Sequence, residues 1–124
     1  MNPLQSGAFN LNVAGFRGVP SSSQSAAYTL SPLDAGRIIF TTANVTIPTG
    51  GFAPGDSIVV YNNSSTQVSL VTTGVNAVQT AYITGQDVNR GAGGTAANIN
   101  LIARGLATII FTGPNSCIVS GNVT

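Results

Sequence analysis

The sequence contains few charged residues. Its 124 residues include four Arg and three Asp but no Lys, Glu or His, so that 6% of the chain is charged. Typical globular proteins are about 25% charged. Four scattered arginines and a net charge of +1 cannot supply the basic patch that neutralises nucleic-acid phosphates. We therefore expect no nucleic-acid partner.

The residue types that carry most enzyme chemistry are also missing. Without His or Glu, and with Cys117 as the single cysteine, the sequence offers no catalytic triad, no His-based acid–base system and no metal-ligand cluster. Asp34 and Asp56 each lie close to Gly in turns, where a short carboxylate caps backbone amides. The sequence therefore predicts no enzyme activity, no catalytic residues, no metal and no cofactor.

Long apolar runs and a standard targeting segment are absent as well. No run reaches the roughly 18 apolar residues of a membrane-spanning helix, and the N-terminus lacks the basic and apolar blocks of a secretory signal. We expect no membrane partner. One cysteine cannot form an intrachain disulfide, and we interpret Cys117, in its apolar run, as a small buried hydrophobic residue.

The low charge also has a consequence for association. The chain is 43% hydrophobic and can build a core, while its surface must be covered by Ser, Thr, Asn and Gly. A net charge near zero gives little electrostatic protection against association. The composition therefore favours a subunit that packs against copies of itself.

The sequence does contain short apolar runs separated by turns. Between Leu33 and Leu70 these runs are rich in Val, Ile, Tyr and Thr and are bounded by Gly, Pro, Asn and Asp, which predicts strands. We interpret the stretch as a meander of antiparallel strands, with a tight hairpin connection at Asn62–Ser65. The predicted strands are Arg37–Thr41, Asn44–Ile47, Ser57–Asn62 and Gln67–Thr72.

The C-terminal part shows the same pattern. Alternating residues around Ile99 and Leu101, an apolar run at Leu106–Thr112, a turn at Gly113–Ser116 and a last run at Cys117–Ser120 predict further strands. The predicted fold class is all-β, a compact antiparallel β-sandwich, jelly-roll or small barrel with an extended N-terminal arm. The predicted core comprises Ile38, Phe40, Val45, Ile47, Ile58, Val60, Val68, Leu70, Leu101, Ile109, Phe111 and Ile118.

Residues 73–97 allow several interpretations. They could form one more strand pair or irregular backbone, and a helix over 75–83 is disfavoured by its β-branched residues. Asp87 and Arg90 are close enough in sequence for a local ion pair. The Gly-rich segment 91–94 predicts a flexible loop, and it lacks the Lys of a phosphate-binding loop.

The chain divides into two parts at residue 27. Residues 28–124 form the β-domain, which Tyr28–Leu30 opens, while residues 1–27 mix isolated apolar residues with Gly, Ser, Asn and Gln. We interpret 1–27 as an extended arm followed by a flexible linker at Pro20–Ser25.

Within the arm, apolar residues follow a strand-like alternation. Phe9, Leu11 and Val13 alternate with Ala and Asn, which suits a short strand lying on another surface, and Phe16 adds a further apolar side chain. A disordered tail is the default for such a terminus. Our hypothesis is that the arm docks on a neighbouring subunit through Phe9, Leu11, Val13 and Phe16.

Residues 28–121 contain a series of turns and strand ends, namely Tyr28–Leu30, Leu33–Gly36, Val45–Pro48, Pro54–Ile58, Tyr61–Asn63, Arg104-Gly105 and Ile118–Gly121. This series resembles the small β-rich virion domains of tailed bacteriophages. Those domains occur at the distal ends of tail fibres and in short capsid-surface proteins. The resemblance implies a virion structural role and trimeric assembly, and it brings no catalytic residues. Residues 1–27 match no fibre pattern.

Within that family the chain length favours one role. A tail fibre carries a long shaft and an attachment domain, for which 124 residues leave no room. We therefore expect a capsid decoration (cement) protein, located on the virion surface, that clamps neighbouring major-capsid subunits. An arm that orders on binding fits such a clamp.

Two other roles stay open. The first is a tail-fibre or head-spike module that binds a host receptor or surface glycan, for which exposed tyrosines would serve. Tyr82 is the best exposed candidate, although Tyr28, Tyr61 and Tyr82 could each simply pack in the sheet. The second is a β-rich adhesin or fibre subunit outside any virus, whose copies would join through an exposed sheet edge.

Overall fold

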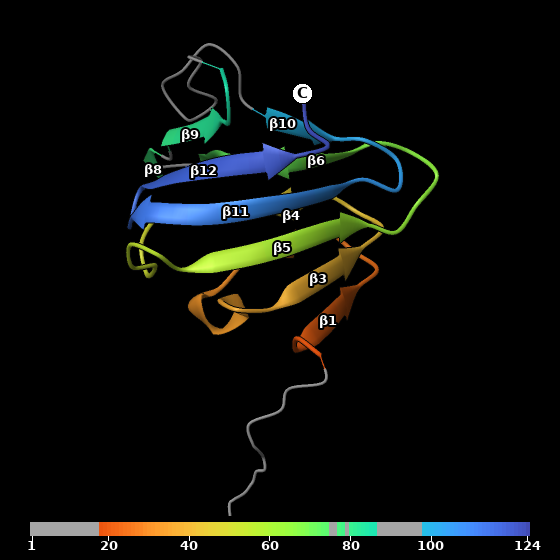
Figure 1. Ribbon diagram of the computed structural model, residues 1–124, viewed down its shortest axis with the longest axis horizontal. Helices are drawn as coiled ribbons and strands as arrows, with labels where there is room; N and C mark the ends of the chain where they lie inside the picture. Colours follow the sequence, from red (N-terminus) through yellow and green to blue (C-terminus); the bar gives the residue numbers. More distant parts are fainter. Residues whose placement is uncertain (1–17, 75–76, 79, 87–97) are drawn as a thin grey trace, which may run out of the picture.

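A computed structural model describes residues 18–74, 77–78, 80–86 and 98–124 of the chain. Over these residues the regular structure is strand apart from one short 3-10 helix, η2 (Pro32–Asp34) (Figure 1). The all-β prediction is therefore confirmed. The strands are β1 (Ser21–Gln24), β2 (Tyr28–Thr29), β3 (Ile38–Thr41), β4 (Val45–Thr46), β5 (Ser57–Asn62), β6 (Val68–Val71), β7 (Thr73–Gly74), β8 (Ala77–Val78), β9 (Thr80–Ile83), β10 (Asn98–Leu101), β11 (Leu106–Gly113) and β12 (Ser116–Gly121).

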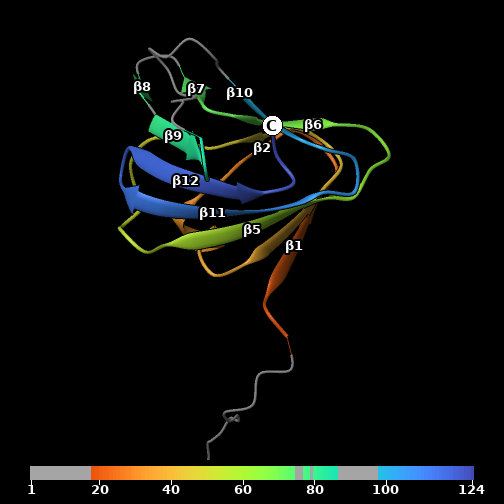
Figure 2. The same ribbon diagram turned by 45° about the horizontal axis from the view of Figure 1, so that its top comes forward.

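Two sheets contain most of these strands. The six-stranded sheet has the order β1-β3-β5-β11-β12-β9, and the four-stranded sheet has the order β10-β6-β4-β2. In Figure 1 the strands β3, β5, β11 and β12 lie side by side at the front, with β4 and β6 behind them. Figure 2 separates the layers, with β2 and β6 on one side of the molecule and β5 and β11 on the other.

The N-terminal half of the chain alternates between the two sheets. β1, β3 and β5 pair in parallel in the six-stranded sheet, and β2, β4 and β6 pair in parallel in the four-stranded sheet. The prediction of an antiparallel meander over Leu33–Leu70 is therefore wrong. The turns between these runs carry the chain across to the other sheet, so strands that follow one another in sequence are not neighbours.

The strands β10, β11 and β12 of the C-terminal half form antiparallel pairs, as predicted, although β12 also pairs in parallel with β9. β11 lies between β5 and β12 and runs antiparallel to both, and the predicted turn at Gly113–Ser116 joins β11 to β12. β10 pairs antiparallel with β6, and Val123 forms an isolated bridge with Leu101. The last residues therefore connect the six-stranded sheet back to the four-stranded one.

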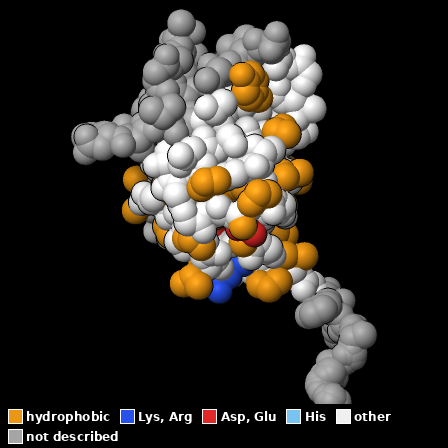
Figure 3. All heavy atoms as spheres, turned by 90° about the vertical axis from the view of Figure 1, so that its left-hand side faces the viewer, with side chains coloured by type: hydrophobic (Ala, Val, Ile, Leu, Met, Phe, Trp, Pro, Cys, Tyr) orange, Lys and Arg blue, Asp and Glu red, His pale blue; other side chains and the backbone are white. Residues whose placement is uncertain are grey.

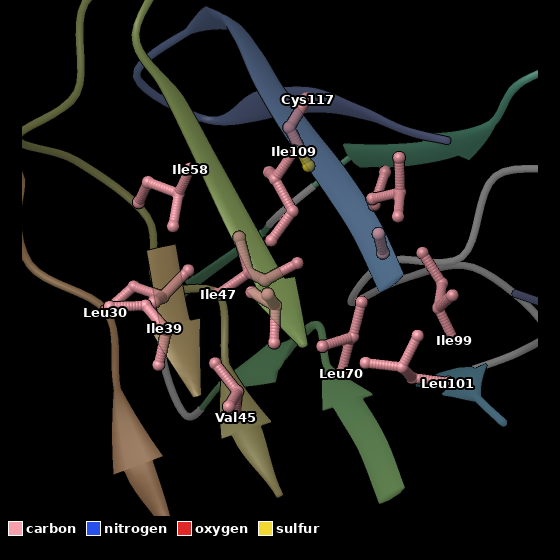
Figure 4. Close-up of a cluster of buried hydrophobic side chains, with 14 of the residues drawn as sticks. Leu30, Ile39, Val45, Ile47, Ile58, Leu70, Ile99, Leu101, Ile109 and Cys117 are labelled. Atoms are coloured by element: carbon pink, nitrogen blue, oxygen red, sulfur yellow. The ribbon is translucent and has the colours of Figure 1, made fainter. Parts of the chain in front are cut away.

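The core lies between the two sheets and draws buried side chains from both. Figure 4 shows Ile39, Ile58 and Ile109 of the six-stranded sheet beside Val45 and Leu70 of the four-stranded sheet. Each strand contributes alternate residues, as its pleat requires. The predicted core is confirmed for Val45, Ile47, Ile58, Val60, Val68, Leu70, Leu101, Ile109 and Phe111.

The predicted inward face of β3 is wrong. Ile39 and Thr41 are fully buried, whereas Ile38 and Phe40 are only partly buried. Because the run Ile38–Phe40 is apolar at every position, its sequence does not indicate which face points inward. Thr41 tolerates burial because its Oγ1 donates to the Ala43 carbonyl (2.8 Å) and accepts from the Ala43 amide (3.0 Å).

The inward face of β12 differs from the prediction in the same way. Ile118 is 39% exposed, while Cys117 and Val119 on either side of it are buried. The interpretation of Cys117 as a small buried hydrophobic residue is confirmed. Cys117 and Val119 therefore point into the core, and the larger Ile118, which the sequence predicts to be buried, points outward.

The predicted linker at Pro20–Ser25 is wrong for Ser21–Gln24, which form β1. This strand pairs in parallel with β3, and the Gln24 Nε2 donates to the Ser22 Oγ at 2.9 Å. Its side chains lie at least partly exposed at the edge of the sheet. Backbone hydrogen bonds can therefore hold a Ser-rich segment as a strand without apolar burial.

The predicted hairpin at Asn62–Ser65 is also wrong, because β5 and β6 belong to different sheets. Asn62 is fully buried and holds this crossing in place. Its Nδ2 donates to the carbonyl oxygens of Thr66 (2.7 Å) and Ile102 (3.0 Å), and its Oδ1 accepts from the Ser64 amide (3.1 Å). Because both the NH₂ group and the oxygen of the buried Asn62 amide are hydrogen-bonded, the connection between β5 and β6 is held in one conformation.

Residues 73–86 contain strands where the structure describes them. β7 and β8 form a small antiparallel pair, and β9 joins the six-stranded sheet in parallel to β12. The strand interpretation is confirmed for these residues, and the described part of 75–83 contains no helix, in agreement with the β-branched residues that disfavour one there. Asp87, Arg90 and the Gly-rich segment 91–94 lie outside the described residues.

Candidate interaction surface

The six-stranded sheet has one side on the core and one side away from it. We call the side away from the core the outer face. Residues paired across neighbouring strands lie on the same side of a sheet, so the strand registers define this face. Its apolar members are Ile38, Phe40, Val59, Tyr61, Tyr82, Leu106, Ile110 and Ile118, none of which is fully buried.

The most exposed row of the outer face crosses β11, β12 and β9. Ile110 pairs with Ile118, which pairs in turn with Tyr82. These side chains are 44%, 39% and 40% exposed, respectively. A contiguous exposed apolar row is more informative than single exposed hydrophobic residues, because such patches mark interaction sites.

A second row crosses β3, β5 and β11. Phe40 pairs with Tyr61, which pairs with Leu106. The Phe40 and Tyr61 rings meet edge to face, with centroids 6.0 Å apart and an interplanar angle of 74°, and Leu106 is 47% exposed. The outer face therefore presents a rigid aromatic contact beside an exposed aliphatic side chain.

No strand of the six-stranded sheet, within the described bounds, contains a charged residue. Asp34, Arg37 and Asp56 precede the parallel strands β3 and β5, and Arg104 lies in the turn before β11. Figure 3 views the end of the molecule that lies at the left in Figure 1, where red and blue atoms gather among uncharged surface. The charges therefore lie at the ends of the strands.

The two described aspartates cap turns, as predicted. The Asp34 Oδ2 accepts from the Ser31 amide (2.9 Å) and from the Tyr28 hydroxyl (2.7 Å), and the Asp56 Oδ2 accepts from the Ala53 amide (2.9 Å). Asp34 is 2% exposed. Each carboxylate stabilises a local backbone conformation rather than facing a partner.

The hydrogen bond from the Tyr28 hydroxyl to Asp34 makes the free energy of unfolding depend on pH in the alkaline range. The hydrogen bond to Asp34, and then burial, raise the pKa of the Tyr28 hydroxyl above its usual value of 10.0. Above about pH 10 the unfolded chain loses this proton first, so its contribution to stability is complete below that pH and is lost as pH rises. We expect the melting temperature of wild type to fall more steeply above about pH 10 than that of Tyr28→Phe, and the two slopes to agree below that pH. Equal slopes above that pH would contradict the assigned contact.

The structure and the sequence differ in the surface that they indicate. The predicted partner-binding residues Phe9, Leu11, Val13 and Phe16 lie outside the described residues. Tyr82 is confirmed as the most exposed tyrosine, at 40%, since Tyr28 and Tyr61 are partly buried.

The outer face itself was not predicted from the sequence. The sequence feature that indicates such a face is a strand with apolar residues on both of its sides, as in β11. β11 carries Ala107, Ile109 and Phe111 inward and Leu106 and Ile110 outward.

In the described part of the chain, no helix is long and apolar enough to cross a membrane. Comparisons of the sequence with protein-family models and with curated proteins, and of the fold with solved structures, found no match. The resemblance to phage virion domains therefore stays a prediction from sequence.

Proposed function

We propose that the chain is a non-enzymatic virion structural protein. Its role would be that of a capsid decoration (cement) protein, which binds the outer head surface and stabilises neighbouring major-capsid subunits. The observation that carries the proposal is the uncharged six-stranded sheet with its apolar outer face. Such a face suits contacts between proteins in an assembly, and the resemblance to phage virion domains supports the same role.

The N-terminal arm would make the contact with the capsid. The described chain begins at Gly18, just before the edge strand β1, so the 17 residues before it start at the margin of the domain. A fully extended segment of that length reaches about 55 Å. Through Phe9, Leu11, Val13 and Phe16 the arm could therefore bind an adjacent subunit.

For the finer fold we propose a β-sandwich with a parallel N-terminal half. One cluster of buried residues includes side chains of both sheets, which supports two layers around a common core. The strand order within each sheet then departs from the antiparallel arrangement predicted from sequence.

A second function is favoured by one observation. Tyr82 lies on the edge strand β9, beside Ile118, with 40% of its side chain exposed. An exposed aromatic ring can stack on the apolar face of a sugar. A tail-fibre or head-spike module that binds a host receptor or glycan is therefore the alternative.

The copy number of the chain per purified particle separates these roles. Quantitative mass spectrometry, with imaging of the labelled chain, should find copies spread over the head in numbers comparable to the capsid subunits. A few copies at the tail would support receptor binding instead. Absence from particles would overturn both virion roles.

Deletion of residues 1–17 tests the arm directly. We expect the shortened chain to keep a folded β-domain, because β1 to β12 form their sheets without this segment. Its binding to purified capsids should fall by at least about tenfold, since the apolar side chains of the arm are lost. Undiminished capsid binding by the shortened chain would contradict the clamp.

A further inference from the structure

We infer that the outer face of the six-stranded sheet is the surface through which copies of this chain associate. The occupant of the face is the same face of a second copy, in a two-fold contact. The inference deepens the proposed function by naming a second copy as a partner, and it rests on that function only for the assembly that the contact serves.

The chemistry of the face selects a partner that is also uncharged. Burying an unpaired charge against Ile110, Ile118 or Leu106 would cost several kcal/mol, so a charged partner surface is disfavoured. Hydroxyl groups of Ser and Thr between the apolar residues, such as Thr108 and Ser120, can bond to one another across a contact. A second copy of this face has both properties.

The size of the face agrees with a weak but specific contact. It spans six strands of four to eight residues each. At spacings of about 4.8 Å between strands and about 3.3 Å per residue, its area is on the order of 500 Å². Two such faces would bury about 1,000 Å², close to the lower limit for a specific interface. Association should therefore depend on protein concentration.

The edges of the sheet lack the residues that commonly prevent contact between copies. Edge strands are often protected by Lys, Pro or bulges. β1 has the sequence SSSQ and β9 the sequence TAYI, without charge or proline. Because neither the face nor its edges carry a repulsive element, another copy can approach without a charged side chain being buried.

The test compares two isoleucines of equal exposure. Ile110 lies at the β11 end of the exposed row, and Ile102 lies between β10 and β11, outside the outer face; each is 44% exposed. We expect Ile110→Asp to weaken self-association of the full chain by more than about tenfold, because it buries an unpaired carboxylate. Ile102→Asp should leave association unchanged. Sedimentation velocity over a wide range of protein concentration measures both.

A second face variant, Ile118→Asp, guards against a folding defect at one position. Circular dichroism and cooperative thermal unfolding must show that each variant is folded. Self-association retained in folded Ile110→Asp and Ile118→Asp would overturn the inference, and so would a monomeric wild-type chain at every concentration. Equal weakening by Ile102→Asp would also overturn it. None of these results changes the copy number per particle, which tests the proposed function separately.

Discussion

Replacing Phe111 by alanine is expected to lower the free energy of unfolding by about 3–5 kcal/mol. Phe111 is fully buried in β11, the strand at the centre of the six-stranded sheet. Its ring stacks on Phe52, with centroids 3.8 Å apart and an interplanar angle of 2°. Truncation would leave a cavity under Phe52 that the surrounding strands cannot fill.

The loss should extend to the loop before β5. The Phe111 amide donates to the Asp56 carbonyl, and the Phe111 carbonyl accepts from the Gly55 amide, both at 2.8 Å. Phe52 lies in the same loop, so the stacked rings and these two bonds hold it against β11. We therefore expect hydrogen exchange in residues 52–56 to increase in the variant.

Phe40→Ala is the matched control for this prediction. Phe40 is the same residue type in the same sheet, but it lies on the outer face and is only partly buried. Chemical denaturation of a dilute sample should give a clearly smaller loss for Phe40→Ala than for Phe111→Ala. Equal losses would contradict the assignment of inner and outer faces.

The sequence predicts strand positions well because each turn between strands requires particular residues, such as Gly, Pro, Asn and Asp, at the turn itself. β5 is predicted with both ends correct, since Gly55-Asp56 precedes it and Asn62-Asn63 ends it. The turn before β12 follows from Gly, Pro and Asn in the same way. Which residues a turn requires depends only on the backbone geometry of a few positions, so the local sequence is enough to indicate the turn.

The sheet to which each strand belongs could not be predicted. Consecutive β3, β4 and β5 are separated by turns that look like hairpin connections, yet they alternate between two sheets. Whether a turn reverses a strand beside its neighbour or carries it to the opposite layer depends on packing of distant strands. β11, which pairs with β5 across more than forty intervening residues, is one of them.

The apolar outer face of the six-stranded sheet is not predicted from the sequence for a related reason. Apolar Ile38, Phe40 and Ile118 were assigned to the core because an apolar residue in a strand is normally buried. In a sheet with apolar residues on both sides, hydropathy alone does not distinguish the core from a surface for another protein. The alternation within β12, where Cys117 and Val119 point inward, became clear only from the register.

The motifs behind the phage resemblance also have local structural reasons. Gly55 has φ +93°, and Asp56 beside it caps the same turn. The Asp34 carboxylate accepts from the Ser31 amide, which closes the 3-10 turn, and from the Tyr28 hydroxyl of β2. Any chain that uses these turns needs similar residues, so the motifs indicate shared turn geometry, and the virion role depends on the particle experiment.

Gly121, the last residue of β12, is expected to be the most sensitive to substitution among the glycines that the structure describes. Its φ is +133°, and a Cβ added there would overlap the carbonyl oxygen of Leu106 and lie 2.9 Å from the Ala107 Cα. That carbonyl accepts from the Asn122 amide at 2.9 Å, and the Asn122 Oδ1 accepts from the Leu106 amide at 3.0 Å. The backbone of β11 is therefore fixed where the methyl group would have to fit.

Gly121→Ala should consequently lower the free energy of unfolding by more than about 3 kcal/mol, through backbone strain and steric overlap together. Gly36→Ala separates the two causes, since Gly36 also has a positive φ (+82°) but has nothing within 4 Å of an added Cβ. It should cost only about 1–2 kcal/mol. Equal losses in urea denaturation would show that the contact with Leu106 relaxes freely. A much larger loss at Gly121 would show that the point where the chain leaves β12 for the four-stranded sheet is rigid, because Val123 is held by its bridge to Leu101.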